Sequence, residues 1–288
     1  MHFTAKPLKN PENLTYFMNF AVIVSTKDLA GVTIKEALMQ VFDFKETGDQ
    51  FDGYPVYRFQ NIKLFTTKTD SILCENIDKK IEADIYVFAT KHKSQSGIPS
   101  LSVHGIGNWG IADKEYGGKN KTLCISPGNY LKDALIFLEK NNMSGFEVVQ
   151  ECTHHGPYLE KPVMFIEIGS TEKQWENKDA AETIARAIIH INMIEPMAYK
   201  NAIGIGGLHT TPNFKKIMMK TDIAVSHVCP KYNLENLNED MIIQAIKKSS
   251  STMAEMAILD WKGLGEHKDR VTGMLKSLGI PFVKTSSF

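Results

Sequence analysis

The chain has 288 residues, with 33 lysines and arginines against 33 aspartates and glutamates, and 43% of its residues are hydrophobic. These values are typical of a globular protein and exclude a disordered, collagen-like or disulfide-scaffold chain. Because the formal net charge is zero, a nucleic-acid partner would need a local basic patch rather than the field of the whole molecule.

The cysteine pattern and the termini indicate a cytoplasmic protein. The four cysteines contain no C-x-x-C pair, which argues against a thiolate zinc ribbon and is typical of a reducing compartment. No apolar run approaches the ~20 residues that span a bilayer. Residues 1–19 lack a signal-peptide core and are interpreted as an N-terminal extension. We expect residues 20–288 to form one body, with lobes 20–95 and 96–288 as the alternative, and to be monomeric.

Strands and helices alternate along the chain. The first half predicts a strand at 20–25, a helix at 32–42, a hairpin of strands 54–59 and 62–67, strands at 83–90 and 101–104, and a helix at 129–142. The second half predicts strands at 146–152 and 162–169, a helix at 175–194, a strand at 203–207, a helix at 214–220, a strand at 222–228, helical stretches at 237–260 and 267–278, and a last strand at 280–284. Most strands are continuously apolar, as in a sheet covered on both faces. The pattern therefore predicts an α/β fold with three layers, α/β/α.

Polar side chains cluster where the predicted strands end. His104, His154 with His155, His209 and His227 follow or close strands, and glycines accompany most of them. In open α/β sheets, ligands bind outside the carboxyl ends of the strands. We therefore expect His104, His154, His155 and His209 to share one pocket.

Each of these residues also has an ordinary interpretation. Two adjacent histidines on a strand point in opposite directions unless a turn redirects them, and one of them could simply cap a carbonyl. Glu167, inside an apolar strand, is costly to bury unless it is paired or metal-bound, and the alternative is an exposed edge. Glu151 could face solvent, and Cys152 could be either a nucleophile or a core residue.

The histidines and Glu167 suit a catalytic zinc site, although no local metal motif is present. Three-ligand zinc sites are often assembled from distant segments, and His104, His154 or His155, Glu167 and His209 could form one. There is no G-x-S-x-G sequence, which argues against an ordinary serine hydrolase. Gly105, Gly107 and Gly110 fit G-x-G-x-x-G, but no helical pattern follows them, so we do not expect dinucleotide binding.

Basic residues near the same strand ends have two interpretations. They are either solvated surface residues or a patch that contacts phosphates. The residues are Lys91, His92, Lys93, Lys215, Lys216 and Lys231. Trp109 or Tyr232 could stack on a base.

Four segments, KHKSQSGIPSLSVHGIGNW, ECTHHGP, FIEIGST and GIGGLH, in this order resemble the archaeal and plant type of D-aminoacyl-tRNA deacylase. The resemblance spans residues 20–235. It implies a phosphorylase/hydrolase-like mixed sheet, zinc as cofactor, and hydrolysis of the ester that joins a D-amino acid to tRNA.

We therefore expect the following roles. The catalytic residues are His154, His155 and Glu167, and the zinc ligands are His104, His155 and His209. The substrate-binding residues are Gly105, Gly107, Asn108, Gly169, Ser170, Thr171, Lys91, His92 and Lys215. Backbone N–H groups at 105–107 or 169–171 would stabilise an oxyanion. The alternatives are a nucleoside phosphorylase or zinc peptidase of the same fold, and a non-catalytic tRNA-binding module.

Overall fold

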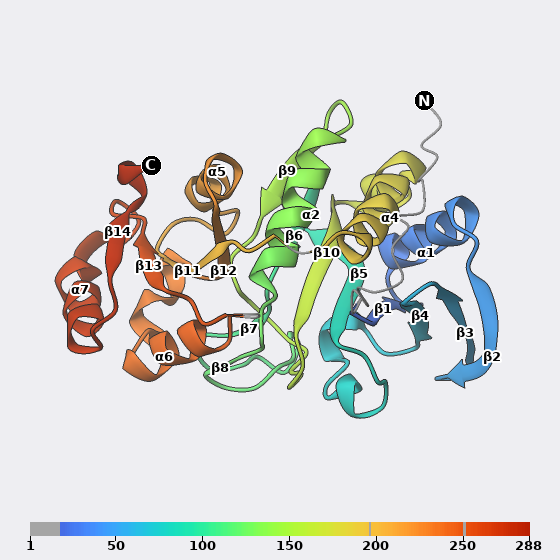
Figure 1. Ribbon diagram of the computed structural model, residues 1–288, viewed down its shortest axis with the longest axis horizontal. Coiled ribbons are helices and arrows are strands. Elements are labelled where there is room, and N and C mark those ends of the chain that lie inside the picture. The colour runs from blue at the N-terminus through green and yellow to red at the C-terminus, as the bar shows by residue number, and fades with distance from the viewer. Residues whose placement is uncertain (1–17, 196, 250–251) are drawn as a thin grey trace, which may run out of the picture.

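The computed structural model describes residues 18–288 except 196, 250 and 251, so most of the expected N-terminal extension lies outside the described residues. Its largest sheet has eight strands in the order β2 (Lys45–Phe51), β3 (Tyr54–Phe59), β4 (Ile62–Thr67), β1 (Phe20–Ser25), β5 (Ile85–Lys93), β10 (Val163–Ser170), β6 (Ser100–His104), β9 (Glu147–Gln150). A second sheet has four strands in the order β12 (Ile223–Cys229), β11 (Lys200–Ile205), β13 (Met256–Leu259), β14 (Phe282–Lys284). A short ribbon pairs β7 (Gly107–Asn108) with β8 (Thr122–Leu123). The two main sheets lie toward opposite ends of the long axis (Figure 1).

The large sheet is mixed, as expected, because β6 runs antiparallel to β10 while β1, β4, β5 and β10 run parallel. β9 is parallel to β6, so the carboxyl ends of β6 and β9 lie at the edge of the sheet opposite to the carboxyl ends of β5 and β10. The second sheet is entirely parallel. The expected site therefore cannot lie at a single carboxyl edge, and its residues must meet where strands of opposite direction adjoin.

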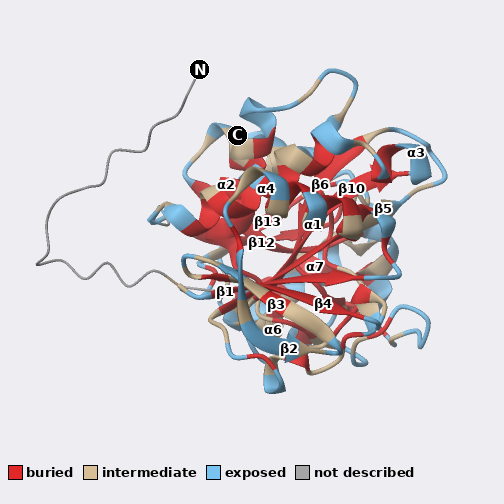
Figure 2. Cartoon of the chain, turned by 90° about the vertical axis from the view of Figure 1, so that its right-hand side faces the viewer, coloured by how far each residue is buried: buried red, intermediate tan, exposed pale blue. Residues whose placement is uncertain are grey.

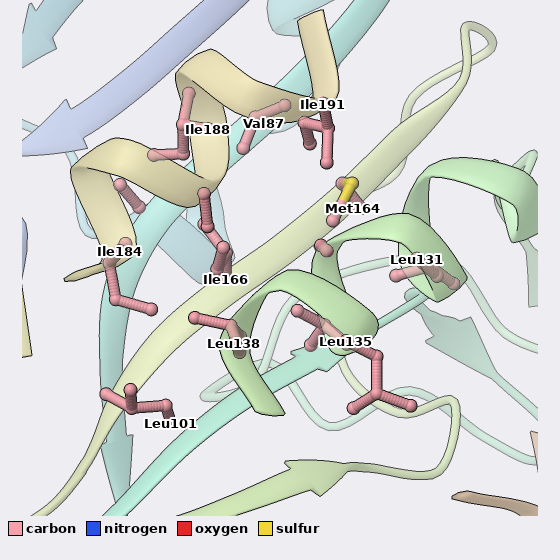
Figure 3. Packing of buried hydrophobic residues seen from close by; sticks show 14 of the residues in the cluster. Val87, Leu101, Leu131, Leu135, Leu138, Met164, Ile166, Ile184, Ile188 and Ile191 are labelled. Carbon is pink, nitrogen blue, oxygen red and sulfur yellow. The ribbon is translucent and has the colours of Figure 1, made fainter. Parts of the chain in front are cut away.

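The two faces of the large sheet are covered differently. One face packs on α1 (Leu29–Val41), α2 (Gly128–Lys140), α3 (Glu172–Trp175) and α4 (Lys178–Met193) in the main hydrophobic cluster. Figure 3 shows Leu135 and Leu138 of α2 and Ile188 of α4 facing the strands. The other face, which carries Phe88 and Phe165, is covered by the short turns η1 (Ser71–Leu73) and η2 (Ile77–Lys79) and by loops. This second face has room for a site.

Helices cover both faces of the four-stranded sheet. α5 (Pro212–Lys220) and α2 lie on one face, while α6 (Glu239–Lys247) and α7 (Lys268–Ser277) pack on the other. Figure 2 shows the buried residues concentrated in strands and inward helix faces, with exposed residues on loops and outer helix faces. The expected α/β/α layering is thus found, with the helical cover of the large sheet on one face. Within the described residues, no helix is long and apolar enough to cross a membrane.

One expected helix is shorter in the structure, and one strand was not expected. The helix expected at 237–260 ends at Lys247, and Met256–Leu259 forms β13. A short apolar run is ambiguous between a buried strand and a helix, and only its pairing with β11 decides. β2 was not predicted because KETGDQF has no apolar alternation; it is a mostly exposed edge strand. β5, which precedes the alternative lobe boundary near residue 95, pairs with β10, which follows that boundary. The division into lobes stays a prediction.

The packing in Figure 3 predicts a large loss of stability on truncating Ile166, which is fully buried between the sheet and α4. Ile166→Ala should lower the free energy of unfolding by about 2–5 kcal/mol, because it removes buried methyl groups and leaves a cavity. Urea denaturation measures this. Ile98→Ala is the matched control at an exposed position (48% exposed) and should change stability by less than about 0.5 kcal/mol. Equal losses in the two variants would contradict the packing described.

Candidate active site and metal centre

Five of the nine histidines converge at one place on the loop-covered face of the large sheet. The ring centroid of His154 lies 4.5 Å from the centroid of His104 and 4.5 Å from that of His209. It lies 4.2 Å from the centroid of His155. His92 lies 5.9 Å from His209. β5 supplies His92, β6 supplies His104, the loop after β9 supplies the pair, and the loop after β11 supplies His209. The expected sharing of one pocket is therefore observed, and His92 joins it.

The loop after β9 turns both members of the histidine pair toward the cluster. His155 has a φ of 45°, a left-handed conformation that breaks the strand alternation. The N–H of Gly107 donates to the carbonyl of His155 at 2.8 Å, and Ile106 forms a bridge with His154. Behind the loop, the buried His227 contacts the hydroxyl of Thr153 through Nδ1 at 3.2 Å. His227 thus supports the loop from behind.

Three histidines present the same nitrogen to the centre of the cluster. Their Nδ1 atoms contact main-chain carbonyls, in His104 that of Gly105 at 3.1 Å, in His154 that of Cys152 at 2.9 Å, and in His155 that of Gly156 at 2.6 Å. A carbonyl only accepts, so Nδ1 carries a proton, and in the neutral ring Nε2 then carries the lone pair. Metal-binding histidines are commonly oriented in this way.

Two carboxylates are buried beneath these rings. Glu151 is 2% exposed and Glu167 is 3% exposed. His92 Nδ1 lies 3.1 Å from Glu151 Oε1 and 3.7 Å from Glu167 Oε2, so one imidazole bridges both acids. His209 Nε2 lies 2.9 Å from Glu151 Oε2. Glu167 is therefore paired rather than at an exposed edge, and Glu151 does not face solvent.

The carboxylates and imidazoles shift one another's protonation. Burial lowers the pKa of His92, but the adjacent carboxylates of Glu151 and Glu167 outweigh burial and raise it to about 10. Burial is likewise outweighed at His209, whose pKa rises to about 10 through hydrogen bonds to Cys152 and Glu151. Burial would raise the pKa of Glu151, yet its bonds to His209 and His92 hold it well below the usual range. At neutral pH the buried negative charge is thus balanced by positive imidazoles.

The pKa values of the pair His154 and His155 are lowered instead of raised. Burial, followed by the charge of His104, lowers the pKa of His155 to about 4. Burial and the charges of His155 and His104 hold the pKa of His154 well below its ordinary value. Both rings are therefore neutral at pH 7, which is the form that binds a metal.

The donor set fits a metal ion such as zinc. His104 Nε2 is fully buried and has no hydrogen-bond partner, and it lies 3.6 Å from Glu167 Oε2. Within the described residues, four groups hold ligand atoms within 4.8 Å of one another: His104 with His154 and His155; Cys152 with His154 and His209; His92 with Glu151 and His209; and His104 with Glu151 and Glu167. The sequence-predicted ligands His104 and His155 share a group, whereas His209 belongs to two others.

The glycines expected to bind substrate have close packing partners. A Cβ on Gly105 would collide with the side chain of Ser126, and a Cβ on Gly107, whose φ is 140°, would lie 2.5 Å from Leu123 Cα. The Gly107 N–H already donates to His155, so it is not a free oxyanion donor. A Cβ on Gly169 would lie 2.9 Å from His92 Cδ2. Gly169 therefore makes room for the ring that bridges the two carboxylates.

The polar residues expected to bind substrate are engaged within the chain. The hydroxyl of Ser170 donates to Ile98 O, and the N–H and hydroxyl of Thr171 donate to Gln174 Oε1. Asn108 Nδ2 donates to Gly117 O at 3.0 Å. These bonds anchor loops beside the cluster, and substrate contacts for these residues stay predictions.

The two lysines assigned to substrate binding face carboxylates. Lys91 Nζ lies 3.9 Å from Asp28 Oδ2, and Lys215 Nζ lies 2.9 Å from Glu139 Oε2. Their phosphate contacts also stay predictions.

Sequence reasoning missed three features of the site. It left Glu151 undecided, because the strand alternation it used ends at Gln150. It assigned His92 to substrate binding beside basic residues, and it did not predict that His92 lies between the two buried carboxylates. It allowed Trp109 to stack on a base, which is wrong because the ring is 1% exposed and its Nε1 donates to Thr153 O. Tyr232 is 55% exposed, and its hydroxyl lies 3.0 Å from His209 Nδ1.

Glu151 provides a matched pair of variants with the exposed Glu147 on β9. Glu151→Gln should lower activity by at least about 10–100-fold, as loss of a group that orients ligands does. Glu147→Gln should leave activity unchanged. In metal-free protein, NMR titration should show the pKa values of His92 and His209 falling from about 10, because Glu151 raises both. Unchanged titration in Glu151→Gln would contradict the pairing described.

Comparison with known proteins places the chain in a family. The family model described as D-aminoacyl-tRNA deacylase matches residues 79–283. A D-aminoacyl-tRNA deacylase of Thermococcus kodakarensis is 37% identical over 91% of this chain and 99% of its own length, and one of Archaeoglobus fulgidus is 34% identical over 84% and 87%. A crystal structure of a conserved protein of unknown function is 32% identical with a TM-score of 0.85, covering 93% of this chain and 95% of its own. The chain belongs to the D-aminoacyl-tRNA deacylase family.

Proposed function

We propose that this chain hydrolyses the ester bond of D-aminoacyl-tRNA and that its histidine cluster holds a zinc ion for that reaction. The reaction class is supported by family membership and by the names of relatives that match almost end to end. The zinc ion is supported by one observation above others. His104, His154 and His155 each have Nδ1 fixed on a main-chain carbonyl, which leaves three Nε2 lone pairs in one small space.

The proposed ligands are His104, His154 and His155. This set replaces His209 of the sequence-based prediction with His154, because His104, His154 and His155 form one group. A zinc ion bound there lowers the pKa of a bound water to about 7 and polarises the ester carbonyl. The neutral state of the histidine pair at pH 7 suits this role.

The remaining residues of the cluster handle protons. Glu167 lies 3.6 Å from His104 Nε2, so we assign its carboxylate to accept the proton of the attacking water. His209 is the most exposed ring of the site, with 35% of its side chain accessible, and Glu151 and Tyr232 hold it at its two nitrogens. We assign His209 to deliver a proton to the ribose oxygen that leaves. Glu151 and His92 orient these groups.

The substrate we propose is tRNA charged with a D-amino acid. Because that substrate belongs to translation, we place the protein in the cytoplasm. We expect it to act as a monomer, which size-exclusion chromatography with light scattering would test.

Hydrolysis of D-Tyr-tRNA and L-Tyr-tRNA, with and without a chelator, tests this proposal. The native protein should hydrolyse the D ester and leave the L ester intact, because the name of the family specifies the D enantiomer of the amino acid. Chelation should abolish activity, and zinc should restore it. His104→Ala should lower bound zinc and activity by at least about tenfold. His190→Ala, which changes a ring of α4 that packs on Phe137 of α2, is the matched control and should change neither.

Other outcomes would select the alternatives. Equal hydrolysis of both esters would contradict the family activity. Cleavage of peptides without tRNA would favour a peptidase, and tRNA binding without release of amino acid would favour a binding module. Full activity in the zinc-free protein would refute the metal role while leaving the deacylase assignment intact.

A further inference from the structure

The carboxyl edge of the four-stranded sheet extends from His209 and Tyr232 of the active site to aromatic and basic residues that no step above uses. All four strands are parallel, so the segments that follow them lie along one edge. Lys231 and Tyr232 follow β12, and His209 lies beyond β11. Trp261 and Lys262 follow β13, and Lys284 ends β14. The edge thus runs from the active site outward, and with strands about 4.8 Å apart it spans roughly 15 Å from β12 to β14.

Two ammonium groups share one indole at the far end of this edge. Lys284 Nζ lies 3.9 Å from the ring centre of Trp261, and Lys268 Nζ, from the start of α7, lies 5.5 Å from it. Within the described residues, neither lysine forms an ion pair with a carboxylate, and the same is true of the exposed Lys231 and Lys262. Like charges gathered without a counter-charge attract an anion.

The carboxylate next to Trp261 has hydrogen-bond partners of its own. Asp260, next to Trp261, accepts from Asn213 Nδ2 at 2.9 Å and from the N–H of Gly263 at 3.2 Å. Its two oxygens therefore serve the loop rather than the lysines.

Arg270 joins this basic group to the rim of the active site. Its guanidinium, on α7, donates to Leu237 O at 2.6 Å and to Leu234 O, at the end of the turn that carries Tyr232. The N–H of Lys231 donates to Gly207 O at 2.9 Å, on the loop that leads to His209. The lysines, Tyr232 and His209 are therefore held in a fixed relation.

We propose that this edge, from Tyr232 to Lys284, binds the single-stranded 3′ end of the tRNA. The inference rests on the proposed function and identifies the surface that the substrate occupies. Lys268 and Lys284, positioned by Trp261, contact backbone phosphates. The exposed ring of Tyr232, fixed through its hydroxyl to His209 and Cys152, stacks on the terminal base beside the reacting ester.

The test compares Lys268→Ala/Lys284→Ala with Lys93→Ala/Lys216→Ala, a control that removes two exposed lysines of the patches predicted from sequence. Binding of uncharged tRNA is measured against salt concentration. Each lost phosphate contact should flatten the slope of log K against log salt by about 0.7–0.9, so the first variant should lose about 1.4–1.8. The control variant should keep the native slope.

Kinetics separate this surface from the chemistry. With D-Tyr-tRNA, Lys268→Ala/Lys284→Ala should raise KM at least about tenfold and leave kcat unchanged. With D-tyrosyl-adenosine, which has no phosphates, it should match the native protein. An unchanged salt slope in this variant, or the loss of slope in the control instead, would overturn the proposal. A flattened slope in a protein whose native form hydrolyses neither ester would support the surface and refute the proposed function.

Tyr232 tests the stacking part. Tyr232→Phe keeps the ring and should bind uncharged tRNA within about twofold of the native protein. Tyr232→Ala should weaken binding at least about fivefold, because base stacking contributes roughly 1–3 kcal/mol per base. Equal binding by the two variants would remove Tyr232 from the surface.

Discussion

Two carboxylates, Glu151 and Glu167, are buried side by side, and the architecture around them compensates their charge. An isolated buried carboxylate is strongly unfavourable, so each requires cationic or metal partners. His92 lies between the two acids, and His209 and His104 complete the surroundings. The same enclosure keeps the His154–His155 pair neutral. A site that separates protonated from neutral imidazoles in this way is suited to hold a cation next to a proton acceptor.

The uneven cover of the large sheet leaves the face that carries this enclosure to loops. Helices pack on one face, where Ile166 and Leu135 form part of the main hydrophobic core. The opposite face is covered by loops, and there Phe165 packs edge-on against His155 while the loop after β9 approaches the sheet. The second sheet completes the site by supplying His209 and Tyr232 from its carboxyl edge. Catalytic groups thus come from both sheets, on loops held by rigid strands.

Much of this could be predicted from sequence. Apolar runs indicated most strands, and polar residues at their ends indicated four of the five histidines. The division into two sheets could not be predicted, because pairing between distant strands leaves no local pattern. The pairing of Glu151 with His92 could not be predicted for a similar reason. Glu151 follows a strand whose alternation suggests solvent, and His92 follows an apolar strand among lysines, so only tertiary contacts bring the two together.

The glycines illustrate the same limit. Gly105 and Gly107 were expected to bind substrate, and the structure shows that a Cβ at either position would collide with Ser126 or Leu123, so packing already requires glycine there and substrate contact stays a prediction. Gly169 makes room for His92, a requirement that appears only when β5 and β10 are side by side. A glycine in the sequence indicates a position where a side chain could be excluded, and only the tertiary structure shows which atoms occupy that space.

The central claim is that the histidine cluster is a zinc centre. Anomalous diffraction from crystals of the native protein, recorded above and below the zinc absorption edge, tests it most directly. The account predicts an anomalous peak within ligand distance, about 2.0–2.1 Å, of Nε2 of His104, His154 and His155. A peak elsewhere on the chain, or crystals of active enzyme with no anomalous signal at the cluster, would contradict it.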